Sequence, residues 1–167
     1  MLSPLNFKRW IDEHRHLLKP PVGNQQIWAN REFMVTVVGG PNARRDYHVN
    51  EGEEFFYQLE GDIVLSVLED GHPRDIRIEE GDIFLLPPNV PHSPQRPPNT
   101  LGLVIERRRL PHERDTFLWI CDGCHAVRHQ ESFHLTNIVT QLPPVFERFR
   151  ANTEARRCKQ CGHSHAD

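Results

Sequence analysis

Long apolar runs and a surplus of positive charge are missing from this sequence of 167 residues, and no secretory signal pattern is visible in it. Its apolar runs cover only a handful of residues, whereas a membrane-spanning helix needs about 20, so we expect no membrane association. Residues 1–6 contain no charged flank that leads into an apolar core, and we therefore expect a cytoplasmic protein. The 20 basic and 23 acidic residues give a net charge of −3, which argues against nucleic acid as a partner.

Alternating βαβ units, internal repeats and low-complexity tracts are missing as well. From Gln26 to about Arg109, short runs rich in Val, Ile and Phe alternate with turns that contain Gly, Pro and Asn. Short strands at this spacing predict a mainly β protein with an antiparallel sandwich or barrel. The predicted strands are Phe33–Val38, Phe55–Leu59, Ile63–Leu68, Ile76–Ile78, Ile83–Leu86 and Leu101–Ile105.

A single helix is expected before these strands. Apolar residues recur at helical spacing over Phe7–Leu18, and Asn6 is suited to cap the first turn. Pro20 and Pro21 are expected to end the helix, in an exposed turn that reaches Asn24.

The last third of the chain has a different character, and we expect two parts. Residues 1–110 would form the N-terminal helix and the barrel, and residues 111–167 an extension too short for a large core of its own. The extension would pack on the barrel to give one structural domain. Within it we expect strands at Phe117–Ile120 and His134–Val139 and a short helix that begins at Pro143.

Only four cysteines are present, and they form two Cys-x2-Cys pairs separated by 33 residues: Cys121, Cys124, Cys158 and Cys161. In the expected reducing compartment such pairs bind metal more often than they form disulfides, although disulfides remain the alternative. Four thiolates complete a tetrahedron, so the pattern predicts a zinc ribbon or a rubredoxin-type iron site. The spacing does not distinguish the two metals.

Two histidines and one glutamate are the candidates for a second metal site. His48 ends a segment of strand-like spacing, Glu54 opens the next strand, and His92 follows the Pro87-Pro88 bend. Side chains that face the inside of a small barrel share one cavity. Two imidazoles and one carboxylate would form a facial triad with open positions, which favours non-haem Fe(II) and O2 chemistry. The alternative is that each is an ordinary surface or hydrogen-bonded side chain.

The spacing around these residues resembles the two motifs of the cupin barrel, a double-stranded β-helix. The matching patterns are Gly40-x5-Asp46-x-His48-x5-Glu54-x6-Gly61 and Gly81-x5-Pro87-x-Asn89-x2-His92-x3-Arg96. Three positions depart from the usual pattern: Asp46 replaces a histidine, Asn89 a glycine and Arg96 an asparagine. The usual three-His-one-Glu site is thereby reduced to two histidines and one glutamate, which leaves up to three positions of an octahedral metal open.

Two arginines are expected on the same strand faces as the proposed ligands. A guanidinium is a planar fork suited to a carboxylate, so Arg44 and Arg96 suggest an anionic substrate, although each could instead be a solvated edge-strand side chain. Glu106 shares its strand face with Val104 and Gly102, but the alternation of side chains along a strand does not show whether that face points inward.

Nearly the whole chain resembles the 3-hydroxyanthranilate 3,4-dioxygenase family of the short bacterial type. The resemblance is carried by the paired cysteine motifs and by these stretches: Phe7–Ile11, Leu18–Asn24, Asp46–His48, Glu53–Gln58, His92–Pro97 and Val104–Arg107. It implies a cupin barrel with an N-terminal helix and a C-terminal four-cysteine extension. It further implies Fe(II) on His48, Glu54 and His92, and favours a second iron, remote from catalysis, on the cysteines.

The resemblance also implies the substrate, an aromatic aminophenol carboxylate, and O2. Arg96 would pair with its carboxylate, Glu106 would accept from its amine, Arg44 would stabilise oxygen or an anionic intermediate, and Asn24 would belong to a loop over the site. The extradiol-type product would be 2-amino-3-carboxymuconate semialdehyde, which cyclises to quinolinate, a precursor of NAD in the kynurenine pathway. A homodimer is implied as well.

Two other functions remain open from the residues alone. One is a different cupin enzyme, such as another aromatic dioxygenase or an isomerase. The other is a noncatalytic cupin sensor with a zinc ribbon for a protein partner. Oxygen uptake with candidate aromatics would separate the three, since the sensor would bind a ligand without consuming oxygen.

Overall fold

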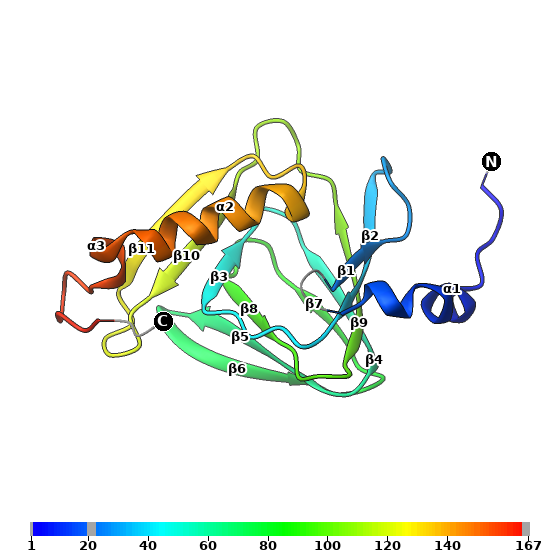
Figure 1. The fold of residues 1–167 in the computed structure, drawn as a ribbon, viewed down its shortest axis with the longest axis horizontal. Coiled ribbons are helices and arrows are strands. Elements are labelled where there is room, and N and C mark those ends of the chain that lie inside the picture. The colour runs from blue at the N-terminus through cyan, green and yellow to red at the C-terminus, as the bar shows by residue number, and fades with distance from the viewer. Residues whose placement is uncertain (1, 20–22, 165–167) are drawn as a thin grey trace.

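The computed structural model describes residues 2–19 and 23–164 (Figure 1). Helix α1 spans Phe7–His14, and the side chain of Asn6 caps it by accepting a hydrogen bond of 3.0 Å from the Arg9 amide, as predicted. The α-helix ends earlier than Leu18, because the chain tightens into a 3-10 turn at Arg15–Leu17, where the Leu18 amide donates to the Arg15 carbonyl. Pro20 and Pro21 lie outside the described residues.

Two antiparallel sheets face each other and form the predicted mainly β barrel of cupin type. The first sheet has the order β1 (Asn24–Gln26), β2 (Phe33–Gly39), β9 (Leu101–Arg107), β4 (Glu54–Glu60) and β7 (Ile83–Leu86). The second has the order β11 (Val127–Phe133), β10 (Asp115–Ile120), β3 (Asp46–Val49), β8 (His92–Gln95), β5 (Ile63–Glu69) and β6 (His72–Ile78). Asn24, expected in a turn, therefore opens a strand.

Apolar side chains fill one end of the space between the sheets. Along β4 the residues at alternate positions, Glu54, Phe56 and Gln58, are buried, whereas Tyr57 is exposed, as a period of two requires. The core of the barrel consists of Phe56, Ile63, Leu65, Val67, Ile78, Leu86 and Val104. Glu54 lies at the edge of this core, where it lines a cavity together with Phe56 and Val104.

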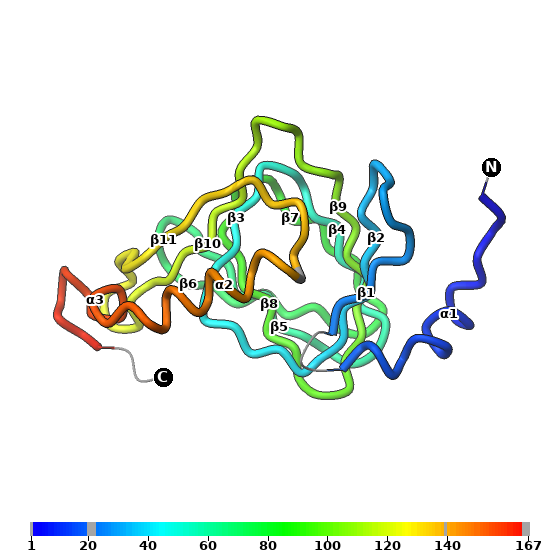
Figure 2. Tube along the Cα trace, turned by 45° about the horizontal axis from the view of Figure 1, so that its top comes forward, coloured from blue at the N-terminus to red at the C-terminus, as the bar shows by residue number. Residues whose placement is uncertain are grey.

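The C-terminal extension joins the second sheet directly, because β10 pairs with β3 and β11 pairs with β10. Helix α2 (Ile138–Ala151) lies across these strands (Figures 1 and 2). Its residues Leu142, Val145 and Phe149 form a hydrophobic cluster with Phe117 and Trp119 of β10. The short helix α3 (Thr153–Arg156) follows, at the end of the molecule opposite α1.

Two expectations for this extension are wrong. The strand is Val127–Phe133 rather than His134–Val139, since the chain leaves the sheet at His134 and enters α2 at Ile138. The helix begins before Pro143, because the side chain of Asn137 accepts from the Thr140 amide and caps a first turn that precedes both prolines. Within the described residues, no helix has the length and apolar character needed to cross a membrane.

Candidate metal centre and substrate cavity

The three proposed iron ligands come from both sheets and meet between them. His48 on β3 and His92 on β8 are register partners in one sheet, and Glu54 projects from β4 of the other. Oε1 of Glu54 lies 3.7 Å from Nδ1 of His48 and 3.3 Å from Nε2 of His92. One ligand atom from each residue lies within 4.8 Å of the others, and all three side chains are buried.

The outer nitrogen of each imidazole has its own acceptor. Nε2 of His48 lies 2.6 Å from Oδ2 of Asp115, and Nδ1 of His92 lies 3.0 Å from the Val90 carbonyl oxygen. With the protons on these two nitrogens, Nδ1 of His48 and Nε2 of His92 would each have a lone pair free for a cation beside the Glu54 carboxylate. Metal-binding histidines are oriented in this way by an outer acceptor, so the residues fit a divalent cation such as Fe(II).

The charge of Glu54 also suits a cation. Burial alone would raise the pKa of this carboxyl, but its contacts with the side chains of His92 and His48 and the charge of the Arg109 guanidinium outweigh burial and lower the pKa to about 2. Burial lowers the pKa of His48, which keeps this imidazole neutral and able to coordinate.

Two of the departures from the usual cupin pattern have a clear structural basis. Asp46 is held by the Arg44 guanidinium and does not belong to the cluster of possible ligand atoms found among the described residues, so it supplies no fourth ligand. Asn89 has φ +62°, a left-handed conformation that glycine adopts freely and asparagine tolerates better than most residues.

A cavity of about 270 Å³ opens beside the triad and contains the other predicted site residues. Asn24, Arg44, Arg96 and Glu106 all line it, together with Val104. The face of β9 that carries Glu106 therefore points inward, a direction that the alternation of side chains in the sequence did not determine. Leu135, Thr136, Asn137 and Ile138, between β11 and α2, line the cavity as well and were not predicted.

The two cavity arginines differ in their partners. Arg44 is paired with Asp46, and its guanidinium carbon lies 5.9 Å from the ring centres of Phe117 and Phe146. Arg96 is only 4% exposed, its Nε has no hydrogen-bond partner among the described residues, and its Nη1 donates a long hydrogen bond of 3.3 Å to Gln58. Burial lowers the pKa of Arg96 to about 10. The cavity thus contains a buried cation that no described carboxylate neutralises.

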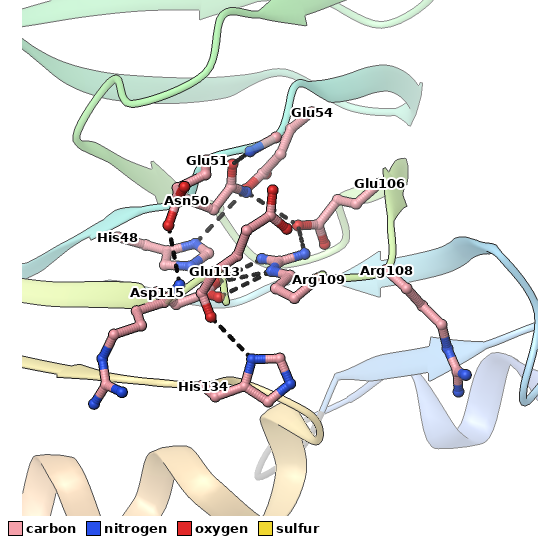
Figure 3. A network of polar contacts seen from close by, with 12 residues as sticks. His48, Asn50, Glu51, Glu54, Glu106, Arg108, Arg109, Glu113, Asp115 and His134 are labelled. Atoms are coloured by element: carbon pink, nitrogen blue, oxygen red, sulfur yellow. Dashed lines mark hydrogen bonds and ion pairs between the residues drawn. The ribbon is translucent and has the colours of Figure 1, made fainter. Parts of the chain in front are cut away.

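Glu106 belongs to a buried polar network that sequence reasoning missed (Figure 3). Nη1 of Arg109 donates to Oε1 of Glu106 at 2.7 Å, and Nδ2 of Asn50 donates to the same oxygen at 3.2 Å and to Oε1 of Glu54 at 2.5 Å. Burial and the nearby Glu54 raise the pKa of Glu106 to about 7, although Arg109 opposes this shift. Only the Glu-Arg-Arg-Arg run at Glu106 and the isolated Asp115 hinted at the network in the sequence.

The four cysteines converge at the end of the extension. Sγ of Cys121 lies 3.5 Å from that of Cys161, and Sγ of Cys124 lies 3.6 Å from that of Cys158. Disulfide sulfurs would be about 2.05 Å apart, whereas a thiolate tetrahedron with bonds of about 2.3 Å has edges of about 3.8 Å. The cysteines are therefore free and arranged as for a metal.

Backbone amides support the thiolates at this second cluster. The Gly123 amide donates to Sγ of Cys121 at 3.4 Å. The amides of Cys161 and Gln160 lower the pKa of the Cys158 thiol to about 6. Metal binding requires deprotonated thiols, so both contacts favour it.

The barrel and its cavity define a cupin with a candidate metal centre. A model of the 3-hydroxyanthranilic acid dioxygenase family matches residues 1–150. A 3-hydroxyanthranilate 3,4-dioxygenase from Ruegeria pomeroyi is 56% identical over 98% of this chain and 92% of its own length. One from Xanthomonas campestris pv. campestris is 54% identical, over 99% of this chain and 93% of its own. The chain belongs to the 3-hydroxyanthranilic acid dioxygenase family.

Among solved structures, a cupin-2 domain containing protein from Shewanella frigidimarina aligns with 59% of this chain and 92% of its own, at 16% identity and a TM-score of 0.49.

Proposed function

We propose that this protein is a 3-hydroxyanthranilate 3,4-dioxygenase that uses Fe(II) held by His48, Glu54 and His92. The substrate would be converted with O2 to 2-amino-3-carboxymuconate semialdehyde, which cyclises to quinolinate. Both oxygen atoms remain in the product, so the reaction needs no external reductant. Iron, when bound, would supply the coordination of the aminophenol and the path for electrons from the ring to O2.

The observation that carries the proposal is the buried, uncompensated guanidinium of Arg96 in the cavity of the triad. A buried charge is costly unless it is paired, so this position favours an anionic ligand. A carboxylate is planar and accepts two parallel hydrogen bonds from a guanidinium. Arg96 would therefore fix the substrate carboxylate and, with it, the orientation of the aromatic ring towards the triad.

The other cavity residues then take complementary roles. Glu106 would accept a hydrogen bond from the substrate amine, because its carboxylate lines the same cavity. Arg44, which is held in place by Asp46, would present its remaining N–H donors to a developing anion rather than clamp the carboxylate. Asn24 on β1 and the segment from Leu135 to Ile138 would restrict the access of water to the cavity.

A panel of three aromatics tests the proposal on the purified protein after anaerobic loading with Fe(II). Oxygen uptake and ultraviolet product spectra would be followed with 3-hydroxyanthranilate, with 2-aminophenol, which lacks the carboxylate, and with 3-hydroxybenzoate, which lacks the amine. We expect rapid uptake with the first and weak uptake with the others. Uptake only with a different phenol would indicate another dioxygenase, and binding without uptake would indicate a sensor.

At the second cluster we infer a structural metal, with iron favoured over zinc. Four thiolates fill a tetrahedron and leave no position for substrate or O2. The metal would connect the residues after α3 to the end of β10. Metal analysis together with visible absorption separates the two metals, since a ferric tetrathiolate is coloured and a zinc site is not.

The remaining expectations concern the cellular setting. Family membership supports a step of the kynurenine pathway towards quinolinate and NAD, carried out by a cytoplasmic homodimer. Light scattering of the purified protein would test the dimer directly, and a monomeric mass would overturn it.

A further inference from the structure

Arg109 contacts two carboxylates at once, the buried Asp115 and the partly buried Glu106, and each of them contacts a different part of the catalytic site (Figure 3). Its Nε donates to Oδ1 of Asp115 at 2.9 Å and its Nη2 donates to Oδ2 at 2.6 Å, which is a bidentate contact. Its Nη1 donates to Oε1 of Glu106 at 2.7 Å. The Arg109 side chain is only 8% exposed, so these contacts are shielded from water.

The first carboxylate leads to the metal centre. Oδ2 of Asp115 lies 2.6 Å from Nε2 of His48, and Asp115 is fully buried. The same oxygen is fixed by Arg109, so it has a single position from which to hold the imidazole. The ring of His48 is therefore oriented by a chain of two contacts that begins at Arg109.

The second carboxylate leads to the substrate cavity. Glu106 and Glu54 are register partners on β9 and β4, and they would repel each other as two bare carboxylates. Asn50 bridges them on one side, and Arg109 draws Glu106 from the other. Without Arg109, Glu106 would lack the charged contact that sets its position relative to the triad.

The two neighbouring arginines on the same segment contact neither Asp115 nor Glu106 through their side chains. Arg107 pairs with Glu113, and Arg108 points away from the network and donates to Asn30 at 3.2 Å (Figure 3). Among these three consecutive arginines, the buried contacts to Asp115 and Glu106 belong to Arg109.

We propose that Arg109 is a positioning residue that couples the two halves of the site, setting His48 through Asp115 and the substrate contact through Glu106. The Glu106 half rests on the proposed function, whereas the His48 half requires only that the triad binds a divalent metal. The planar fork is essential to this role, because a lysine ammonium cannot make the three contacts in their observed directions.

The test compares four variants of the full chain with the parent: Arg109→Lys, Asp115→Asn, Glu106→Gln and Arg108→Ala. Arg109→Lys keeps a positive charge beside the buried Asp115 and the partly buried Glu106, so it is preferred to alanine, which risks unfolding. Arg108→Ala is the matched control, since it removes an adjacent arginine that lies outside the network. Two constants are measured anaerobically: the Kd for Fe(II), and the Kd for 3-hydroxyanthranilate at saturating Fe(II). Steady-state rates follow on the loaded proteins.

We expect Asp115→Asn to weaken Fe(II) binding about 10- to 100-fold, the range for outer contacts of metal ligands, with little change in the substrate Kd. Glu106→Gln should weaken substrate binding and leave Fe(II) binding within about twofold. Arg109→Lys should weaken the binding of both Fe(II) and 3-hydroxyanthranilate, and Arg108→Ala should weaken neither. In double variants, Arg109→Lys should add little to the Fe(II) effect of Asp115→Asn and little to the substrate effect of Glu106→Gln.

Several results would overturn the coupling. Arg109→Lys could lower the melting temperature and leave both constants unchanged, which would make the residue structural only. Additive effects in both double variants would show that Arg109 does not act through these carboxylates. If the parent binds Fe(II) but neither binds nor oxidises 3-hydroxyanthranilate, the proposed function fails, and unchanged Fe(II) binding in Arg109→Lys would separately reject the His48 half.

Discussion

Replacing Arg96 with methionine should stabilise the substrate-free protein while it abolishes efficient turnover. Methionine is unbranched and uncharged, so it would follow the arginine stem and remove a buried guanidinium that no described carboxylate neutralises. The matched control is Arg44→Met in the same cavity, where the removed guanidinium is paired with the buried Asp46. The two substitutions remove the same group from one cavity, yet we expect opposite effects on stability.

The magnitudes follow from the charges. Burial lowers the pKa of Arg96 from 12.5 to about 10, and at about 1.4 kcal/mol per pKa unit the charged form is disfavoured by about 3 kcal/mol. Losing the 3.3 Å hydrogen bond to Gln58 costs about 1 kcal/mol, which leaves a net gain of about 2 kcal/mol in the free energy of unfolding. Arg44→Met leaves Asp46 without its guanidinium partner, a loss of about 3–5 kcal/mol.

Urea denaturation of the iron-loaded, substrate-free proteins at neutral pH measures the change in stability, and steady-state kinetics measure the change in turnover. Loss of a charge-assisted bidentate contact should lower kcat/KM of Arg96→Met for 3-hydroxyanthranilate by about 2–4 kcal/mol. The parent and Arg96→Met should react about equally with 2-aminophenol. Equal destabilisation by Arg96→Met and Arg44→Met, or an Arg96→Met protein that keeps its preference for the carboxylate, would refute the reasoning.

Three further predictions concern the metals and the ion pairs. Substitution of His48, Glu54 or His92 by alanine should abolish turnover while the protein still folds. If one of these variants keeps near-native activity and its iron, the substituted residue is not a ligand of the catalytic iron. Cys158→Ser should lose one metal per chain and melt lower, yet retain turnover once Fe(II) is supplied; a folded, iron-loaded but inactive variant would argue for electron transfer between the sites. The Arg107 hydrogen bond and the Leu110 amide lower the pKa of Glu113 from 4.5 to about 2, so this carboxylate stabilises the fold above pH 4.5 and loses its contribution as the pH falls through about 2. Glu113→Gln should therefore destabilise at pH 7 and progressively less below pH 4.5 in denaturation curves, and a pH-independent difference would contradict this assignment.

The barrel and the positions of its candidate ligands could be predicted because both depend on local spacing. Strands of period two separated by Gly, Pro and Asn turns define the inward positions, and the two motifs place His48, Glu54 and His92 at such positions. The helix cap at Asn6 and each of the two Cys-x2-Cys pairs are equally local signals.

The contacts that orient these residues could not be predicted, because they depend on distant pairing. Asp115 reaches His48 only because β10 lies beside β3, 67 residues away in sequence. The direction of Glu106 depends on which face of β9 turns towards β4, and a period of two does not distinguish the faces. At α2, the two prolines drew the predicted start to Pro143, whereas the cap at Asn137 determines it.

The central claim is tested most directly by measuring oxygen and substrate together in one anaerobically loaded sample. With Fe(II) as the only added metal and no reductant, the account predicts that one O2 is consumed for each 3-hydroxyanthranilate and that quinolinate accumulates afterwards. Consumption of O2 that requires a reductant, or tight binding of 3-hydroxyanthranilate without any consumption of O2, would contradict it.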